Sequence, residues 1–330
     1  MRKFFALLVS IIIFGSVVLL PGCSDSVAEV AVEENFPMLV DTRGTEVKMN
    51  TVFTLKGNEV TYNMNTRRIV CVFGSQDVVA FGVKLLAYES STEAFGYESF
   101  YEGATKLQDG QPFSEEEILS FEPELIFVNQ NMSSDNIETL SKIAPTIPLY
   151  TDSDDFYVRL NYIGRILGLE ENARALIEYA EGLKERMLAE MCSYGLQDKT
   201  LTIFTYLGNI SIVPERGWFM NTIIYDYLGV KRLDNVREFM QDESGSVYEP
   251  ISAENLRNYE GDLVIFAGFG EKKITTYVSE NEGWKMLNAV KEDRVGVIDL
   301  TPYAQKGVIL LYNQYYQIMQ ALKTAAKITS

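Results

Sequence analysis

The chain has 330 residues, with 29 Lys or Arg against 46 Asp or Glu, and a formal net charge of −17. This charge excludes broad binding to nucleic acid, because such binding needs a basic face for the phosphates. The chain contains no His, which excludes Ser-His-Asp and Cys-His catalysis and His-ligated zinc or haem. A chain of this length is expected to form about two domains.

The first 22 residues have the pattern of a secretory signal, with Arg2 and Lys3 before an apolar run over 4–20. The following Leu-Pro-Gly-Cys sequence resembles the lipobox of bacterial lipoproteins, although Pro21 is unusual in that motif. The resemblance implies cleavage before Cys23, a lipid on its thiol, and a protein held on the extracytoplasmic face of the cell membrane. The alternative is an uncleaved membrane anchor.

The two other cysteines, Cys71 and Cys192, are far apart in the sequence. Cys71 lies in an apolar run and Cys192 near the end of a helical pattern, so both are expected to be buried or half-buried free thiols. A disulfide between them is the alternative, because the spacing alone does not decide the pairing.

Alternating strands and helices are predicted along the rest of the chain. Residues 37–62 alternate in polarity around 41–44, which predicts a β-hairpin. Continuous apolar runs, typical of buried parallel strands, occupy 69–73, 125–128, 201–204, 263–266 and 295–298. Helical patterns occupy 76–83, 115–121, 135–143, 157–168 and 308–326. This alternation predicts α/β layers.

An internal repeat indicates two lobes of similar architecture. Residues 114–127 and 252–265 share one pattern at an offset of 138 residues, a short capped helix followed by a turn and a buried strand. Ser114 and Glu117 have the spacing of a capping box. Between the copies, 171–194 has apolar residues at helical spacing, no Pro and one Gly, which predicts one long helix.

The predicted fold is therefore two Rossmann-like lobes with central parallel sheets, joined by a single long α-helix. The expected organisation is a signal at 1–22, a flexible acidic tether at 23–36, a first lobe at 37–170, the connecting helix at 171–195 and a second lobe at 196–330.

The order and spacing of these features resemble the substrate-binding lipoproteins of ABC importers for ferric siderophores and vitamin B12. The matching segments are 41–44, 68–70, 116–128, 254–266 and 284–295. The resemblance implies a monomeric soluble domain that delivers its ligand to a permease with a cytoplasmic ATPase. It also implies that one Glu on each lobe, Glu116 and Glu254, meets Arg residues of the permease. The alternative for each Glu is a carboxylate stabilised by a helix dipole.

Ligand contacts are expected where the parallel strands end, because these ends face the crevice of open α/β sheets. The candidates are Ser75, Gln76, Asn129, Tyr206, Phe269 and Tyr303. Ordinary turn chemistry is the alternative for each of them. Arg216 and Trp218 add a guanidinium beside an aromatic ring, which suits a bulky ligand with anionic oxygens.

These candidates favour capture of an iron(III)-siderophore without catalysis. The siderophore supplies every ligand of the iron, so no cofactor and no metal ligand from the protein are expected. The sequence has no Gly-x-Ser-x-Gly elbow and no phosphate loop. Cobalamin or haem as the ligand of the same fold, and a lipoprotein that senses a ligand and reports to a membrane receptor, remain alternatives.

Overall fold

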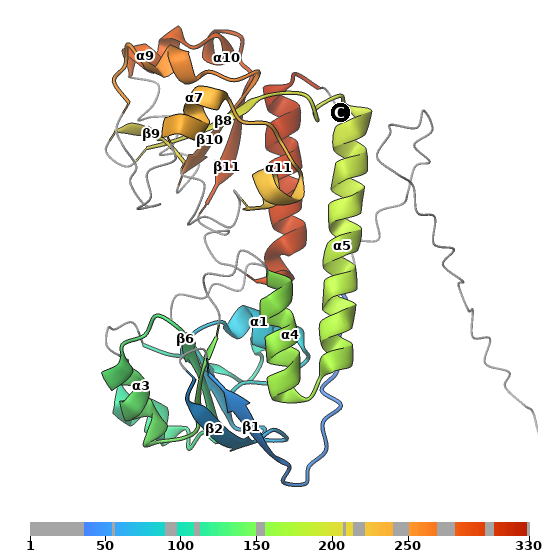
Figure 1. Ribbon diagram of the computed structural model, residues 1–330, viewed down its shortest axis with the longest axis vertical. Coiled ribbons are helices and arrows are strands. Elements are labelled where there is room, and N and C mark those ends of the chain that lie inside the picture. The colour runs from blue at the N-terminus through green and yellow to red at the C-terminus, as the bar shows by residue number, and fades with distance from the viewer. Residues whose placement is uncertain are drawn as a thin grey trace, which may run out of the picture. The chain divides into compact units, whose positions relative to one another are not determined.

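The structure is a computed structural model that describes residues 36–54, 57–89, 98–108, 113–149, 156–206, 209–213, 222–239, 251–268, 281–300 and 307–328. Within these ranges the chain forms two sheets dominated by parallel strands, a separate hairpin and several helices (Figure 1). None of the helices described is both long and apolar enough to cross a bilayer.

The hairpin consists of β1 (Met49–Phe53) and β2 (Glu59–Asn63), paired antiparallel. Between the two strands, the Thr54 amide donates to the Asn58 carbonyl over 2.8 Å. The hairpin is thus confirmed, but its predicted position around 41–44 is wrong. That segment is instead fixed by charge, because the Asp41 carboxylate pairs with both Arg43 and Arg67.

The first sheet contains five parallel strands in the order β5-β4-β3-β6-β7. They are β3 (Ile69–Cys71), β4 (Ala87–Tyr88), β5 (Thr105–Lys106), β6 (Leu125–Asn129) and β7 (Thr146–Leu149). Successive side chains face opposite sides, as the strand period requires. Ile69 packs toward α1 (Ser75–Ala80) and α4 (Phe156–Leu167). Val70 packs toward α2 (Glu115–Ser120) and α3 (Ser134–Ser141). A 3-10 turn, η1 (Glu98–Tyr101), follows β4.

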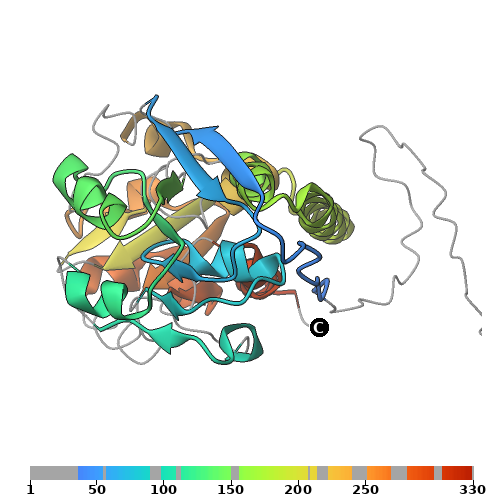
Figure 2. The same ribbon diagram turned by 90° about the horizontal axis from the view of Figure 1, so that it is seen from below.

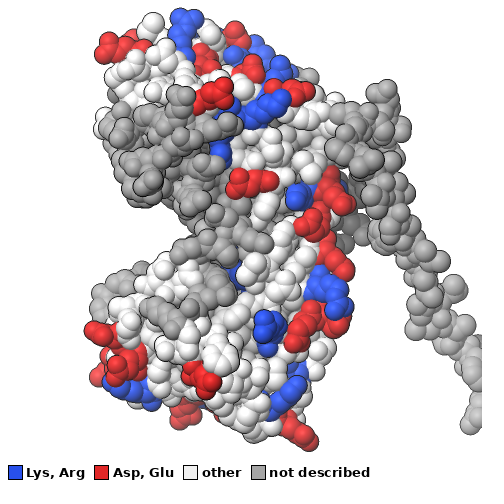
Figure 3. All heavy atoms as spheres, in the orientation of Figure 1, with Lys and Arg blue, Asp and Glu red and all other residues white. Residues whose placement is uncertain are grey.

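The predicted long helix is confirmed as α5 (Glu170–Ser193). Its buried stripe includes Leu176, Leu183 and Met187 at helical spacing, and it ends before Gly195, which adopts a left-handed φ of 64°. Figures 1 and 2 show α4 and α5 running side by side, and α5 also contacts α11 (Leu311–Ala325). Basic and acidic side chains are intermixed on the surface over α5 (Figure 3).

The second sheet has the strand order β11-β10-β8-β9. Its strands are β8 (Leu201–Tyr206), β9 (Ile210–Ile212), β10 (Leu263–Gly268) and β11 (Val295–Asp299). Three are parallel, and β9 pairs antiparallel with β8. One face packs on α11. The other carries a cluster centred on Trp284, whose ring meets Phe204 and Phe266 edge-on at centroid distances of 5.7 and 5.3 Å.

Short helical segments complete this part of the chain. They are the π-helix η2 (Thr222–Tyr227), α7 (Asp234–Phe239), the 3-10 helix η3 (Leu256–Tyr259), α9 (Glu282–Met286), α10 (Asn288–Lys291) and the 3-10 turn η4 (Val308–Leu310). Residues of η3, α9 and α10 contribute to the Trp284 cluster. η4 leads directly into α11.

One hydrophobic core runs through both sheets. It includes Ile69 and Phe127 of the first sheet, Leu176 of α5, and Leu201 and Ile265 of the second sheet. Each sheet adds a smaller separate core on its opposite face. The two sheets and the long helix therefore confirm the predicted α/β architecture, and the helices between the sheets bury apolar surface from both.

The internal repeat is visible in the strand pairing. Ile69 of β3 lies opposite Leu125 of β6, and Leu201 of β8 lies opposite Leu263 of β10. The first copy begins with α2, whose cap Ser114 accepts from the Glu117 amide over 3.2 Å. The expected capped α-helix in the second copy is wrong. Residues 252–255 form a tight turn there and only the 3-10 helix η3 follows.

Candidate functional site

The carboxyl ends of the first sheet's strands present half-buried aromatic and amide groups. Tyr88 ends β4, and its ring centroid lies 4.5 Å from that of Tyr101. Asn129 ends β6, and its Oδ1 accepts from the Asn131 amide over 2.7 Å. Asn129 is half-buried. Burial raises the pKa of the Tyr101 hydroxyl, so this ring stays neutral.

Two predicted contacts at this edge, Ser75 and Gln76, lie inside the protein. Ser75 is 0% exposed and Gln76 is 3% exposed. The Ser75 amide donates to Glu89 Oε1 over 3.1 Å, and Ser75 Oγ lies 3.2 Å from the Tyr101 hydroxyl. In this structure both side chains are therefore covered by the rest of the protein.

A buried ion pair lies beside them. Asp77 of α1 accepts from Arg159 Nε of α4, and these side chains are 1% and 3% exposed. The second oxygen of Asp77 accepts from the Val308 amide at the start of η4 over 3.0 Å. A Cβ on the neighbouring Gly307 would lie 2.7 Å from the side chain of Gln76. The chain returning from the second sheet is therefore packed tightly onto α1.

The contact of Asp77 with Arg159 and Val308 is not predictable from the sequence. Asp77 is 82 residues from Arg159 and 231 from Val308, and no local pattern links positions so far apart. An acidic residue in a helix's first turn, as Asp77 is, is ordinarily explained by the helix dipole alone.

At the second sheet, Tyr206 ends β8 and is half-buried against the Trp284 cluster. The adjoining strand β10 ends at Gly268. The other predicted contacts lie outside the described residues, so their roles stay predictions. These are Arg216, Trp218, Phe269 and Tyr303, and the same holds for the lipidation site Cys23.

The two predicted docking carboxylates are both exposed. Glu116 stands in the first turn of α2, and Glu254 stands in the turn before η3. In the described part of the chain, neither side chain makes a hydrogen bond or an ion pair. Both carboxylates are therefore available to a partner, and only Glu116 has the support of a capped helix.

The described residues offer binding groups rather than reactive ones. Cys71 is a free, fully buried thiol, and burial raises its pKa well above the usual range. The prediction of a free buried thiol is therefore confirmed for Cys71, and the alternative of a disulfide between Cys71 and Cys192 is wrong. The prediction of a free thiol is wrong for Cys192, which is disulfide-bonded. Among the described residues, no three His, Cys, Asp or Glu side chains are grouped so that they could hold a metal ion.

Comparison with curated proteins gives relatives over most of the chain. The iron(3+)-hydroxamate-binding protein YxeB of Bacillus subtilis is 25% identical over 272 residues, which cover 80% of this chain and 82% of that protein. The iron-uptake system-binding protein of the same organism is 29% identical and covers 58% of this chain and 60% of its own length. The iron(3+)-hydroxamate-binding protein FhuD, also of Bacillus subtilis, is 28% identical and covers 68% of this chain and 71% of its own length.

Solved structures share the fold. Unliganded FhuD2 from Staphylococcus aureus superposes with a TM-score of 0.70 at 20% identity, covering 84% of this chain and 100% of that one. The structure of the same protein with bound ferrioxamine B gives a TM-score of 0.65 at 20% identity and covers 79% and 100% of the two chains. The family model described as periplasmic binding protein matches residues 87–302. This match covers α5, the second sheet and every strand of the first sheet except β3, and the chain belongs to the periplasmic binding protein family.

Proposed function

We propose that this chain captures a ferric hydroxamate siderophore between the carboxyl edges of its two sheets and delivers it to an ABC permease. The observation that carries the proposal is the similarity to two curated iron(3+)-hydroxamate-binding proteins, at 25% and 28% identity over 80% and 68% of this chain. A fold neighbour holding ferrioxamine B supports the same ligand class.

The proposed contacts come from both sheets. Asn129 and Tyr206 are half-buried at strand ends, where a side chain can reach a ligand. Arg216 and Trp218 would supply positive charge and a ring face, and Phe269 and Tyr303 are proposed as further contacts. Ser75 and Gln76 are omitted because they are buried. The siderophore keeps all the iron ligands, and the chain binds it without catalysing a reaction.

Tryptophan fluorescence tests the ligand. The chain has two tryptophans, and Trp284 is 7% exposed inside the second lobe's separate core. Quenching by a ligand should therefore come from Trp218. We expect ferrioxamine B and ferrichrome to quench with micromolar or tighter affinity, and ferric catecholates, haem and cobalamin to bind more weakly. Trp218→Phe should abolish the quenching. Tight binding of cobalamin or haem with no response to either hydroxamate would contradict the proposal.

Docking on the permease is proposed to use Glu116 and Glu254. Both carboxylates are exposed and unpaired within the described residues, and association through exposed charges is sensitive to charge reversal. The double variant Glu116→Arg/Glu254→Arg should lower uptake by roughly tenfold or more while ligand affinity stays unchanged. A matched control is Glu178→Arg/Glu185→Arg, because both of these residues are exposed on α5. Equal uptake by the docking and control variants would exclude this surface.

We propose that residues 1–22 are a cleaved signal and that Cys23 carries the lipid. Residues 23–36 then form the tether that holds a monomeric soluble domain at the extracytoplasmic face of the membrane. The first lobe is 37–170, the connecting helix 171–195 and the second lobe 196–330. Cys23→Ala should release the protein from the membrane fraction and abolish palmitate labelling. Retention of the label by this variant would exclude Cys23 as the site.

A further inference from the structure

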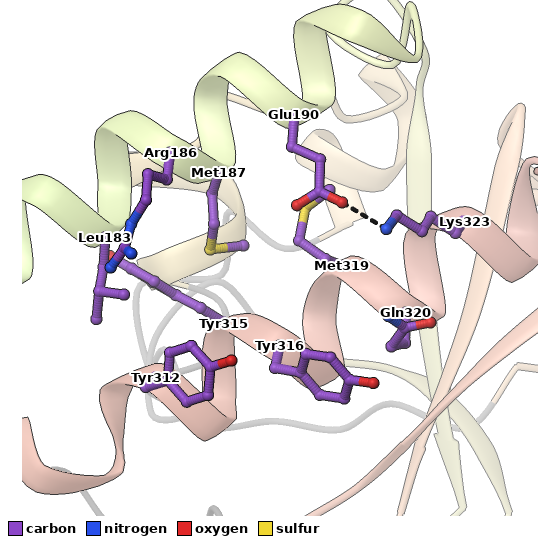
Figure 4. A pocket seen from close by; sticks show the side chains of 10 residues that line it. All are labelled: Leu183, Arg186, Met187, Glu190, Tyr312, Tyr315, Tyr316, Met319, Gln320 and Lys323. Atoms are coloured by element: carbon purple, nitrogen blue, oxygen red, sulfur yellow. Dashed lines mark ion pairs between the residues drawn. The ribbon is translucent and has the colours of Figure 1, made fainter. Parts of the chain in front are cut away.

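A groove lies between the two long helices α5 and α11, away from the strand ends discussed above. Its volume is about 290 Å³, close to the lower limit of about 300–1,000 Å³ for small-molecule sites. Side chains of α5 and α11 face one another across it (Figure 4). A cavity of this size fits one or two aromatic rings.

The walls of the groove are apolar and aromatic. Met187 of α5 and Met319 of α11 are 5% and 3% exposed. The rings of Tyr312 and Tyr316 line the α11 side (Figure 4), and Tyr316 is 56% exposed although it is a large ring. Thioether sulfurs and aromatic faces both pack favourably on an aromatic ligand.

The groove carries one uncompensated positive charge. Lys323 is neutralised locally, because it forms an ion pair with Glu190 across the groove (Figure 4). Partial burial lowers the pKa of Lys323, but the bond and charge of Glu190 outweigh this and the net shift is upward. Arg186 also lines the groove. In the part of the chain that the structure describes, its guanidinium makes no hydrogen bond or ion pair.

Tyr315 adds a further aromatic ring to the groove wall. It lines the groove and is 2% exposed. Its hydroxyl oxygen is enclosed by protein, so the ring is the part of this side chain that a ligand can contact. A carboxylate oxygen accepts charge-assisted hydrogen bonds from a guanidinium, and Arg186 is the groove residue that can donate them.

We propose that this groove binds a small aromatic carboxylate. The rings of the ligand would lie between Met187, Met319 and Tyr316, and its carboxylate would meet the guanidinium of Arg186. An amine ligand is disfavoured, because the only groove carboxylate among the described residues is already paired with Lys323. The site is separate from the sheet edges and does not depend on the proposed siderophore function.

Isothermal titration of the full chain with 4-biphenylcarboxylate tests the proposal. We expect submillimolar binding, and binding at least about tenfold weaker for the neutral analogue 4-biphenylmethanol. Arg186→Glu should weaken carboxylate binding by at least about tenfold. Arg174→Glu makes the same charge change on α5 at an exposed residue outside the groove, and it should leave the affinity within about twofold.

A second pair of variants locates the ligand without relying on charge. Gln320 is an exposed lining residue of α11, and Gln320→Trp should fill the groove and remove binding. Thr324→Trp places the same ring on an exposed position of α11 outside the lining set and should bind as the wild type does. No binding by the wild type at about 1 mM ligand, or wild-type affinity in both Arg186→Glu and Gln320→Trp, would overturn the proposal. Equal affinity for the neutral analogue would overturn the role of Arg186.

Discussion

The sheet before α5 has five parallel strands, whereas the sheet after it has four, one of them antiparallel. The two sheets share a central parallel pair, β3 with β6 and β8 with β10. They differ in how the turn before the second strand of that pair is held. In the first sheet, Arg68 donates to the carbonyls of Phe121 and Glu122 over 2.6 and 2.7 Å. In the second, Gly261 lies directly against the backbone of Thr200. The strand pairing is thus common to both lobes, while each lobe stabilises its turn with different contacts.

Among the described residues, the lobes differ in the buried Asp77–Arg159 pair, which belongs to α1 and α4 beside the first sheet. Asp77→Ala should lower the free energy of unfolding by about 3–5 kcal/mol, because it leaves a buried guanidinium unpaired. Urea unfolding measures the change. The exposed pair Asp198–Lys231 beside the second sheet is the matched control, and Asp198→Ala should leave the unfolding midpoint almost unchanged.

A double variant separates the effect of the Asp77–Arg159 ion pair from the effect of side-chain packing. Asp77→Leu/Arg159→Met replaces both charges with apolar groups, and it should be more stable than Asp77→Ala because no buried charge remains. If the double variant is as unstable as the single one, the loss comes from packing or from the lost bond to Val308. The ion pair would then not be the difference between the lobes.

The second prediction tests the turn in the two copies of the repeat. A Cβ on Gly261 would lie 2.8 Å from the Thr200 carbonyl oxygen. Gly261→Ala should therefore lower the free energy of unfolding by about 1–3 kcal/mol, because the added methyl group overpacks against rigid backbone. The corresponding residue in the first copy is Pro123. Pro123→Ala should lower the free energy of unfolding by only about 0.4–1 kcal/mol, mainly because the unfolded chain gains conformational entropy. Thermal unfolding of both variants gives the comparison, and equal losses would mean that the backbone of Thr200 can move aside.

The third prediction concerns the helix caps of the repeat. Ser114 caps α2 through the Glu117 amide, so Ser114→Ala should lower the free energy of unfolding by about 1 kcal/mol. Ser252 occupies the same place in the second copy, where no capped α-helix forms. Ser252→Ala should therefore change it by less than about 0.5 kcal/mol. Chemical unfolding of both variants measures this difference, and a loss at Ser252 as large as that at Ser114 would reveal a cap in both lobes.

Much of the fold can be predicted from the sequence, because the spacing of apolar residues indicates helices and the length of continuous apolar runs indicates buried strands. The strands β3, β6, β8, β10 and β11 coincide with continuous apolar runs, and α5 matches its prediction to within one residue at each end. The missed strands β4, β5, β7 and β9 are short. β7 also contains Pro148, which ordinarily argues against a strand. The hairpin turn was misplaced because Asp41 and Gly44 favour a turn, although Asp41 is used in ion pairs.

The candidate site was less predictable than the fold. A position directly after a strand indicates the sheet edge, and this rule places Asn129 and Tyr206 at half-buried strand ends. It does not predict the burial of Ser75 and Gln76, where α1 begins and turns both side chains into the interior. Burial of that kind depends on the approach of Gly307 from the other end of the chain. Only tertiary packing determines such a contact.

The smallest expected effect is electrostatic and compares the residues just before β6 and β10. Glu124 accepts from the Thr66 hydroxyl over 2.6 Å, and Asp262 accepts from the Thr200 amide and hydroxyl over 2.9 and 3.0 Å. The bond from the Thr200 amide, although opposed by burial, holds the pKa of Asp262 below its usual value. A carboxylate with a lowered folded pKa adds stability above its unfolded pKa, about 3.9, and loses it as the pH falls through the folded value.

Asp262→Asn removes this charge while keeping an oxygen that accepts from Thr200. The variant should lose less than about 1 kcal/mol at pH 7, because the carboxylate is mostly exposed and solvent screens it. The difference from the wild type should shrink as the pH falls below about 4, where the unfolded chain binds the proton first. Urea unfolding across this pH range measures it, with Glu124→Gln as the counterpart in the first lobe. A difference that stays constant with pH would show that the Thr200 contact acts through shape alone, and the two lobes would then differ in geometry but not in charge.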